Sequence, residues 1–372
     1  MSVAGEASPV TPFGDRLAAA VEERRSQVVL GLDPDPVRLW SAAVEEAAEL
    51  RAALSAALAS TERMAAHALR GTAADPAGAG RGADAASTAG EETAGLRSHP
   101  SSSGISLAAD DAPPRLAAAA DVLAHCLAVI DAAGPACVAV KPQLACFERL
   151  GFAGWLALEQ TCAHARRAGL LVLADGKRGD VPVTAAAYGQ ALLGATPTAY
   201  GPAPGLKADA VTANPLLGGD ALAPLIDTAR AAGAGVFALV RTSNPGAADV
   251  FDLPLADGRP LWERLAAAVH DAGAPGPASG LSDVGAVCGA TVPAHLTRMR
   301  ELMPHTPFLL PGVGAQGGDV ATLAAAVKPG RAGALVTASR SIVDAHRTIG
   351  GDAAQAARAE AERLRAAAWA LG

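Results

Sequence analysis

Eight short apolar runs recur along the chain, and each ends where polar residues or prolines begin. Runs of this kind, rich in Val, Leu and Ala, are typical of parallel strands that are buried on both faces. We expect strands over residues 28–33, 137–142, 170–177, 208–214, 236–244, 284–291, 308–315 and 332–340. Because parallel strands need long crossover connections, this series constrains the fold more than any other feature.

Helical patterns fill most of the intervals between these runs. We expect helices over residues 12–25, 37–70, 115–133, 154–168, 184–193, 220–232, 261–272, 294–303 and 319–327. Eight strands that alternate with helices over roughly 300 residues are typical of a closed barrel rather than of two stacked open sheets. The predicted fold class is therefore α/β, a (β/α)8 TIM barrel that forms a single domain over residues 1–372.

One segment breaks the pattern after the first strand and helix. Residues 71–114 consist mainly of Gly, Ala, Ser, Thr and Pro, and their only larger aliphatic residues are Leu96, Ile105 and Leu107. Such a segment cannot bury enough apolar surface to offset the entropy lost on ordering. We expect a disordered, low-complexity insertion without a chemical role.

Composition limits the classes of partner. A net charge of −7 offers no basic stripe for nucleic acid, so small molecules are the expected ligands. Five cysteines without a C-x-x-C pair indicate a reducing cytoplasm, and no metal site is expected. Since we find neither a basic segment followed by an apolar run at the start nor an uncharged apolar stretch of about 18 residues, we expect no secretion and no membrane span.

Charged and polar residues cluster at or just after the expected strand ends. In a barrel of this class the carboxyl ends of the strands form the active site. The segment LVLADGKRGD places Asp175 and Lys177 two residues apart, on one side if the backbone stays extended. This D-x-K-x-x-D spacing is a weak signal alone, and a solvated turn is the alternative. The residues in such positions are Asp33, Lys141, Asp175, Lys177, Ser243, Gln316 and Arg340.

Two of these positions allow alternative chemistry. The loop PGVGAQGG also fits the dinucleotide pattern G-x-G-x-x-G, but it follows the seventh strand and no acidic residue stands about 20 residues later. We favour a phosphate monoester, bound by this loop and by Arg340 after the eighth strand. Lys141 could form a Schiff base or join a charged network, and its expected neighbour Asp175 favours the network. No histidine occupies a strand end.

These residues resemble a known family, orotidine 5'-phosphate decarboxylase, in its longer bacterial subtype (type 2). The resemblance covers nearly the whole chain outside the insertion. The motifs that carry it, in order, are LDPDP, KPQLACFE, LADGKRGDVPVT, DAVTANPLLGGD, TSNPG, VCGATVP, PGVGAQGG and SR.

The resemblance implies an enzyme that converts orotidine 5'-monophosphate to UMP and CO2 without metal or organic cofactor, in pyrimidine biosynthesis. It implies a homodimer in which Asp180 and Thr184 reach the partner's site. Lys177 would deliver the proton to C6. The implied catalytic residues are Lys141, Asp175, Lys177 and Asp180. The implied substrate-binding residues are Asp33 for the ribose, Ser243 for the pyrimidine, Gln316 and Arg340 for the phosphate, and Thr184.

The chain departs modestly from the family pattern, and two other functions compete. Gln143 and Cys146 stand where relatives often carry asparagine and an aromatic residue, and Val181-Pro182 replaces a common Ile-Gly. A magnesium-dependent sugar-phosphate lyase of the same superfamily shares D-x-K-x-x-D but would need an acidic residue where Lys141 stands. A noncatalytic barrel that binds phosphate ligands is the second alternative.

Overall fold

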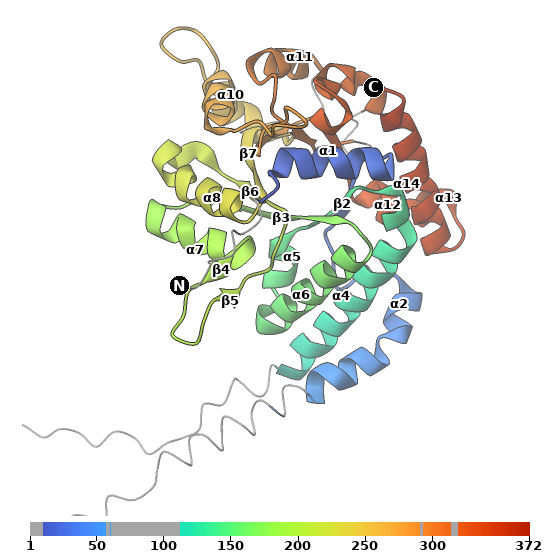
Figure 1. Cartoon of the computed structure of the whole chain (residues 1–372). Coiled ribbons are helices and arrows are strands. Elements are labelled where there is room, and N and C mark those ends of the chain that lie inside the picture. The colour runs from blue at the N-terminus through green and yellow to red at the C-terminus, as the bar shows by residue number, and fades with distance from the viewer. Residues whose placement is uncertain (1–9, 57–59, 61–111, 291–292, 314–318) are drawn as a thin grey trace, which may run out of the picture.

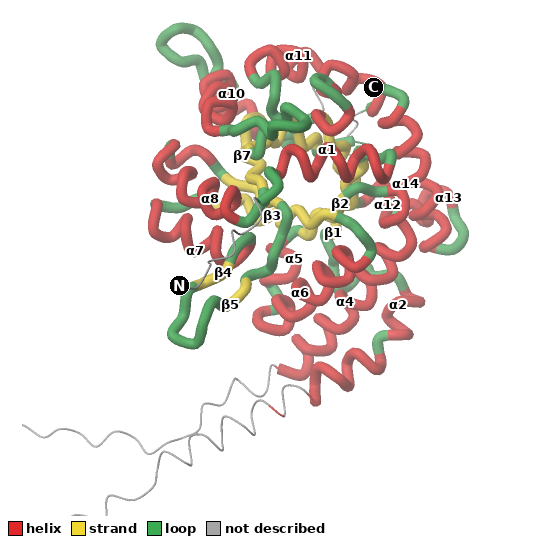
Figure 2. The backbone as a smooth tube through the Cα atoms, viewed as in Figure 1, coloured by secondary structure: helices red, strands yellow, loops and turns green. Residues whose placement is uncertain are grey.

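A closed barrel of eight parallel strands forms the centre of the molecule in a computed structural model that describes residues 10–56, 60, 112–290, 293–313 and 319–372. The strands follow one another around the barrel in the order β1-β10-β9-β8-β7-β6-β3-β2, and helices surround them (Figure 2). The strands are β1 (Val28–Leu32), β2 (Ala139–Pro142), β3 (Leu171–Arg178), β6 (Ala210–Ala213), β7 (Gly235–Arg241), β8 (Val284–Cys288), β9 (Phe308–Leu310) and β10 (Ala334–Ala338). Each lies within or within one residue of a run predicted from the sequence, so the (β/α)8 barrel is confirmed.

The helices form the outer layer, and several short 3-10 turns join them to the strands. The α-helices are α1 (Phe13–Arg24), α2 (Ser41–Glu46), α4 (Ala112–Ala133), α5 (Leu144–Glu148), α6 (Gly151–Arg167), α7 (Pro182–Leu192), α8 (Gly219–Ala231), α9 (Ala248–Phe251), α10 (Leu261–Ala272), α11 (Pro293–Leu302), α12 (Arg340–Val343), α13 (Ala345–Ile349) and α14 (Ala353–Trp369). The 3-10 helices are η1 (Gly134–Ala136), η2 (Pro215–Leu217), η3 (Pro245–Ala247), η4 (Val320–Val327) and η5 (Arg331–Gly333).

Alternation along each strand divides the core into two layers. On β1, Val28 and Leu30 pack outward with the helices, whereas Val29 joins the cluster inside the barrel. Helix α1 crosses one end of the barrel (Figure 1). Its Phe13 packs edge to face against Phe237 of β7, with ring centroids 5.9 Å apart. Because α1 fills this end, the opposite end, where the strands finish, is left for chemistry.

The structure differs from the predicted elements at several places. The hairpin of β4 (Ala195–Thr196) and β5 (Ala203–Pro204) was not predicted, because its strands are two residues long and exposed. Residues 319–327 form the 3-10 helix η4 after Asp319, whose side chain caps it, rather than an α-helix. In the helix predicted over residues 37–70, α2 begins only at Ser41, after the prolines of LDPDP, and ends at Glu46, and a separate helical segment covers 48–56.

The predicted insertion lies largely outside the described residues. Residues 61–111 are not described, and α4 begins at Ala112, so the insertion predicted over 71–114 lies outside the described residues except for its last three residues. Of the described helices, one is long and apolar enough to cross a membrane, over Pro114–Ala136. Of its most apolar window, 67% is buried inside the protein, where α4 packs against α2, α6 and α14.

Candidate active site

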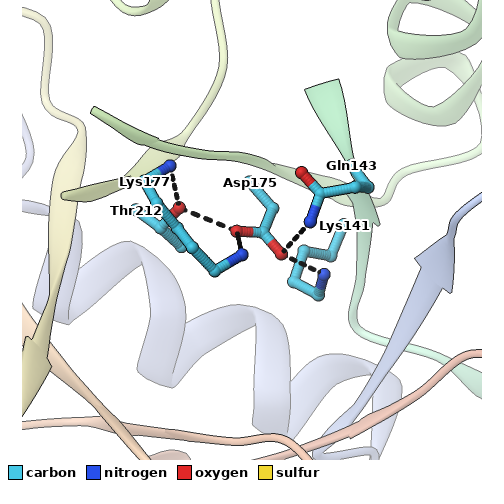
Figure 3. Close-up of polar contacts among 5 residues, drawn as sticks. All are labelled: Lys141, Gln143, Asp175, Lys177 and Thr212. Atoms are coloured by element: carbon cyan, nitrogen blue, oxygen red, sulfur yellow. Dashed lines mark hydrogen bonds and ion pairs between the residues drawn. The ribbon is translucent and has the colours of Figure 1, made fainter. Parts of the chain in front are cut away.

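Asp175 is the centre of a charged network at the carboxyl ends of β2, β3 and β6. Its carboxylate is buried, with 7% of the side chain exposed. Lys141 from β2 places Nζ 2.5 Å from Oδ2, and Lys177 places Nζ 2.6 Å from Oδ1 (Figure 3). The structure therefore brings together three of the four residues predicted to be catalytic, each carboxylate oxygen facing one ammonium group.

Two neutral side chains complete the shell around this carboxylate. The Thr212 hydroxyl lies 2.8 Å from Oδ1, and the Gln143 amide donates to Oδ2 over 3.3 Å. Burial alone would raise the pKa of Asp175, but the charges of Lys141 and Lys177 and their hydrogen bonds outweigh it and hold the pKa at about 2. The site therefore keeps a fixed negative charge between two ammonium groups at neutral pH.

The two lysines differ in their access to a ligand. The side chain of Lys141 is 9% exposed, whereas that of Lys177 is 43% exposed. The Lys141 ammonium group is thus buried against the carboxylate, and little of this side chain is open to a ligand. The Lys177 side chain is partly exposed while its ammonium group contacts Asp175, an arrangement that suits proton donation to a bound molecule.

Lys177 lies within β3, as predicted, but its backbone departs from the extended geometry on which the one-sided arrangement was conditional. Its φ is 46°, in the left-handed region, and the pairing of β3 with β6 shifts register between Ala174 and Arg178. A non-glycine residue in this conformation costs about 1–2 kcal/mol. The Lys177 N–H donates to Thr212 Oγ1 over 2.9 Å, which offsets part of that cost. This turn, rather than the alternation of side chains along a regular strand, directs the Lys177 side chain toward Asp175.

Asp180 and Thr184 follow β3, on the loop to α7 and in the first turn of that helix. Asp180 Oδ1 accepts the N–H of Val181 over 2.8 Å, and Thr184 lies in the first turn of α7. Among the described residues of this single chain, the structure records no hydrogen bond or ion pair from Asp180 to either lysine. Val181 and Val183 beside them are 55% and 84% exposed.

Asp33 and Arg340 line one cavity of about 390 Å³ between the ends of β1 and β10. Gly31 of β1 is required here, because a Cβ atom at this position would stand 2.6 Å from Cβ of Ser339. Helix α12 begins with Arg340. Trp40 stabilises this helix, because its indole N–H donates to the Val343 carbonyl over 3.0 Å. The structure thus brings these two predicted substrate-binding residues to one cavity, which His125 and Cys126 of α4 also line and which Lys141, Asp175 and Lys177 do not.

The last two predicted residues differ in how far they can be placed. Ser243 follows β7 and is half-buried, and Gly289 lets the chain after β8 approach it: a Cβ atom on Gly289 would lie 2.9 Å from Ser243 Cα. Gln316 lies outside the described residues.

The sequence analysis missed Thr212 and gave Gln143 no role in the site. Thr212 stands inside the motif DAVTAN, where a threonine is an ordinary strand former. Only its place two residues before the end of a predicted strand, on the face of Ala210, could have signalled it. Gln143 was noted only as a departure from relatives.

Comparison with known proteins identifies the kind of barrel. The profile of the "Orotidine 5'-phosphate decarboxylase / HUMPS family" matches residues 114–358. An orotidine 5'-phosphate decarboxylase of Deinococcus radiodurans is 43% identical over 262 residues, which cover 68% of this chain and 90% of the relative. One of Rhodopirellula baltica is 43% identical over 223 residues, covering 60% of this chain and 72% of the relative.

Solved structures agree with these sequence relatives. A crystal structure from Streptomyces avermitilis that carries the same enzyme name superposes with a TM-score of 0.65 and 28% identity, covering 100% of this chain and 99% of that one. The OMP decarboxylase of Leishmania donovani gives a TM-score of 0.57 at 26% identity, covering 96% and 98%.

Proposed function

The chain belongs to the orotidine 5'-phosphate decarboxylase / HUMPS family and is a decarboxylase of orotidine 5'-monophosphate, and we propose that Lys177 delivers the proton that replaces the departing CO2. The bond from C6 of the pyrimidine to its carboxylate breaks, and the electron pair stays on C6. The Lys177 ammonium donates a proton to that carbon, giving UMP, and solvent restores the proton to the lysine. The products are UMP and CO2.

The observation that carries this assignment is the pairing of one buried carboxylate with two ammonium groups. A carbanion at C6 is poorly stabilised by its own ring, so preorganised positive charge must favour it over the starting carboxylate. Lys177, 2.6 Å from Asp175 and 43% exposed, has the position and the protons for this role. Lys141 pairs with Oδ2, the other oxygen of the Asp175 carboxylate, and fixes the orientation of that carboxylate.

The same geometry weighs against the lyase alternative. A magnesium-dependent lyase needs carboxylate oxygens that are open to the metal ion, with an acidic residue at the position of Lys141. Here Lys141 itself occupies that position, and both oxygens of Asp175 already accept from ammonium groups. A noncatalytic barrel would have no use for a half-exposed lysine held against a buried charge.

We assign substrate binding to residues at the end of the barrel where the strands finish. The shared cavity of Asp33 and Arg340 supports a ribose hydroxyl on the carboxylate and a phosphate on the guanidinium. Ser243 would contact the pyrimidine, and Gln316 would contact the phosphate. Since the phosphate is remote from C6, its binding energy can orient the reacting ring.

We further propose a homodimer in which Asp180 and Thr184 complete the partner's site. Asp180 contacts neither lysine of its own chain among the described residues, and exposed apolar residues follow the ends of β3 and β6. These are Val181 and Val183 after β3, which are 55% and 84% exposed, and Leu216 and Leu217 of η2 after β6, which are 49% and 56% exposed. We also place the enzyme in the cytoplasm, since all five of its cysteines are free thiols.

A direct assay tests the assignment. The purified protein is incubated with orotidine 5'-monophosphate in EDTA, and the loss of ultraviolet absorbance is followed. We expect turnover, with UMP and CO2 formed in equal amounts. Turnover only after magnesium is added, or binding without turnover, would favour one of the alternatives.

A further inference from the structure

We infer that Thr212 is a positioning residue for proton transfer: its hydroxyl fixes the Lys177 backbone and the Asp175 carboxylate relative to each other. This inference rests on the proposed role of Lys177. Thr212 is 1% exposed and lies on β6 with its side chain toward the barrel interior, on the face of Ala210. Its hydroxyl is therefore shielded from solvent, and it bonds both to Asp175 and to the backbone of Lys177.

The chemistry of the two partners fixes the direction of both hydrogen bonds. The Lys177 N–H can only donate, so the hydroxyl oxygen accepts over 2.9 Å. The ionised Asp175 carboxylate can only accept, so the hydroxyl donates to Oδ1 over 2.8 Å. A hydroxyl has one proton and free lone pairs, and here it uses the proton and one lone pair at once.

These two bonds close a ring through Lys177. The backbone N–H of Lys177 is bound to Thr212, Thr212 is bound to Asp175 Oδ1, and the Lys177 ammonium is bound to the same Oδ1 over 2.6 Å (Figure 3). The backbone N–H and the ammonium group of Lys177 are thus both linked to Asp175 Oδ1, the first through the Thr212 hydroxyl and the second directly. This restricts the positions of the ammonium group before substrate arrives.

The ring also holds a backbone conformation that lysine rarely adopts. Lys177 has φ of 46°, at the point where the pairing of β3 with β6 changes register. Without the hydroxyl, the N–H of Lys177 loses the acceptor that stabilises this turn. The ammonium would then sample positions away from C6 while the lysine remained present and charged.

Threonine combines two properties that the position needs. Its branched Cβ suits a strand inside a barrel, and its hydroxyl supplies the donor and the acceptor. Valine keeps the shape and removes the hydroxyl. Serine keeps the hydroxyl and removes the methyl group. The two substitutions therefore separate packing from hydrogen bonding.

The experiment compares Thr212→Val with Thr212→Ser in the full-length enzyme. We expect kcat of Thr212→Val to fall about 10- to 100-fold, with KM and the Kd of UMP within about threefold of wild type. Thr212→Ser should recover kcat to within about threefold. Hydrogen exchange at the Lys177 amide should be faster in Thr212→Val and near wild type in Thr212→Ser.

Thr161→Val is the matched control. Thr161 is fully buried in α6, and its hydroxyl donates to the Ala157 carbonyl over 2.8 Å, away from the site. This variant should leave kcat unchanged. Thr212→Ala repeats the test without a branched side chain.

Two outcomes would overturn the inference. One is a wild-type kcat in Thr212→Val. The other is a loss that serine fails to restore, together with a wild-type exchange rate at the Lys177 amide, because packing would then explain the effect. If the wild-type enzyme itself does not turn over orotidine 5'-monophosphate, the proposed function fails, while the exchange measurement still tests the contact.

Discussion

Lys177 is the side chain from which the largest catalytic loss is expected. Lys177→Ala removes the proton donor and one fixed positive charge, so we expect kcat to fall by at least about a thousandfold. Binding of UMP should persist, because the proposed phosphate and ribose contacts lie on other strands. Steady-state kinetics and calorimetry with UMP measure the two effects.

The chain offers a control for this substitution. Lys207 is exposed and also has a positive φ, of 56°, so Lys207→Ala makes the same chemical change in a similar backbone conformation. It should retain wild-type kcat. A Lys177→Ala enzyme with near-normal turnover would remove the lysine from the mechanism.

Asp175 predicts a dependence of stability on pH. Its pKa is about 2 in the folded protein, below the ordinary value of 3.8, so the ionised carboxylate stabilises the fold above the ordinary value, and that contribution is lost as pH falls toward 2. We expect the gap in unfolding free energy between wild type and Asp175→Asn to shrink by about 1 kcal/mol from about pH 5 to about pH 3.

Urea unfolding at a series of pH values measures this gap. Asp249→Asn, which removes an exposed carboxylate, serves as the control and should show no comparable narrowing. A gap that stays constant over the range would mean that the carboxylate is not held ionised by its two lysines.

Sequence reasoning reached the charged residues of the network around Asp175 but not its two neutral members, Thr212 and Gln143. Lys141, Asp175 and Lys177 interrupt apolar runs, and a charge at the end of a buried strand has few structural explanations. Thr212 carries no such signal, since threonine is common in strands whether or not its hydroxyl is used. Nor could spacing reveal the left-handed turn at Lys177, because the turn depends on a contact with another strand.

At the scale of elements, Arg300 joins the last helices and strands of the barrel. Its buried guanidinium lies on α11 and donates to the carbonyls of Met303, Thr306, Ala326 and Gly333 over 2.7 to 2.9 Å. Burial lowers its pKa to about 10. One side chain thus satisfies carbonyl groups around η4, η5 and the turn before β9.

We expect Arg300→Met to lower the unfolding free energy by about 3 kcal/mol, because several buried carbonyls lose their donor. Arg298→Met on the same helix is the control. Arg298 is 45% exposed and pairs with Glu263 and Glu301, so its loss should cost less than about 1 kcal/mol. Denaturant unfolding measures both, and equal effects would contradict the assigned role of the buried arginine.

The sequence predicted elements well where their burial is continuous and poorly where a few local contacts decide them. Barrel strands are covered on both faces, so their apolar runs are unmistakable. The β4–β5 hairpin is exposed and contains prolines, and residues after Asp319 form a 3-10 helix. The final helix, α14, was not predicted, although Asp352 caps its first turn.

At the scale of the whole molecule, the proposed dimer predicts that two inactive variants complement each other. Lys177→Ala and Asp180→Ala should each be nearly inactive alone. If Asp180 acts on the partner's site, a mixed dimer has one site with both residues intact. Equal mixing and reassociation should then recover about a quarter of wild-type activity.

Rate measurements on the mixture, after subunit exchange, decide the question. Mixing Lys177→Ala with Lys177→Ala, carried through the same exchange, is the control and should recover nothing. The absence of recovery in the Lys177→Ala and Asp180→Ala mixture, with exchange shown by mass spectrometry, would mean that Asp180 serves its own chain or neither.

The pairing of β1 with β10 has a consequence for how the enzyme is made. Val28 lies beside Val336, so the earliest strand of the barrel finds one of its two neighbours only in the latest. While a ribosome is still adding the intervening residues, β1 and the newest strand each present unpaired backbone groups, which invite association with other nascent chains. The sheet can therefore close only after synthesis has passed Ala338. A chain that terminates before this residue keeps an open sheet with unpaired edges, which favours aggregation over a shorter active enzyme.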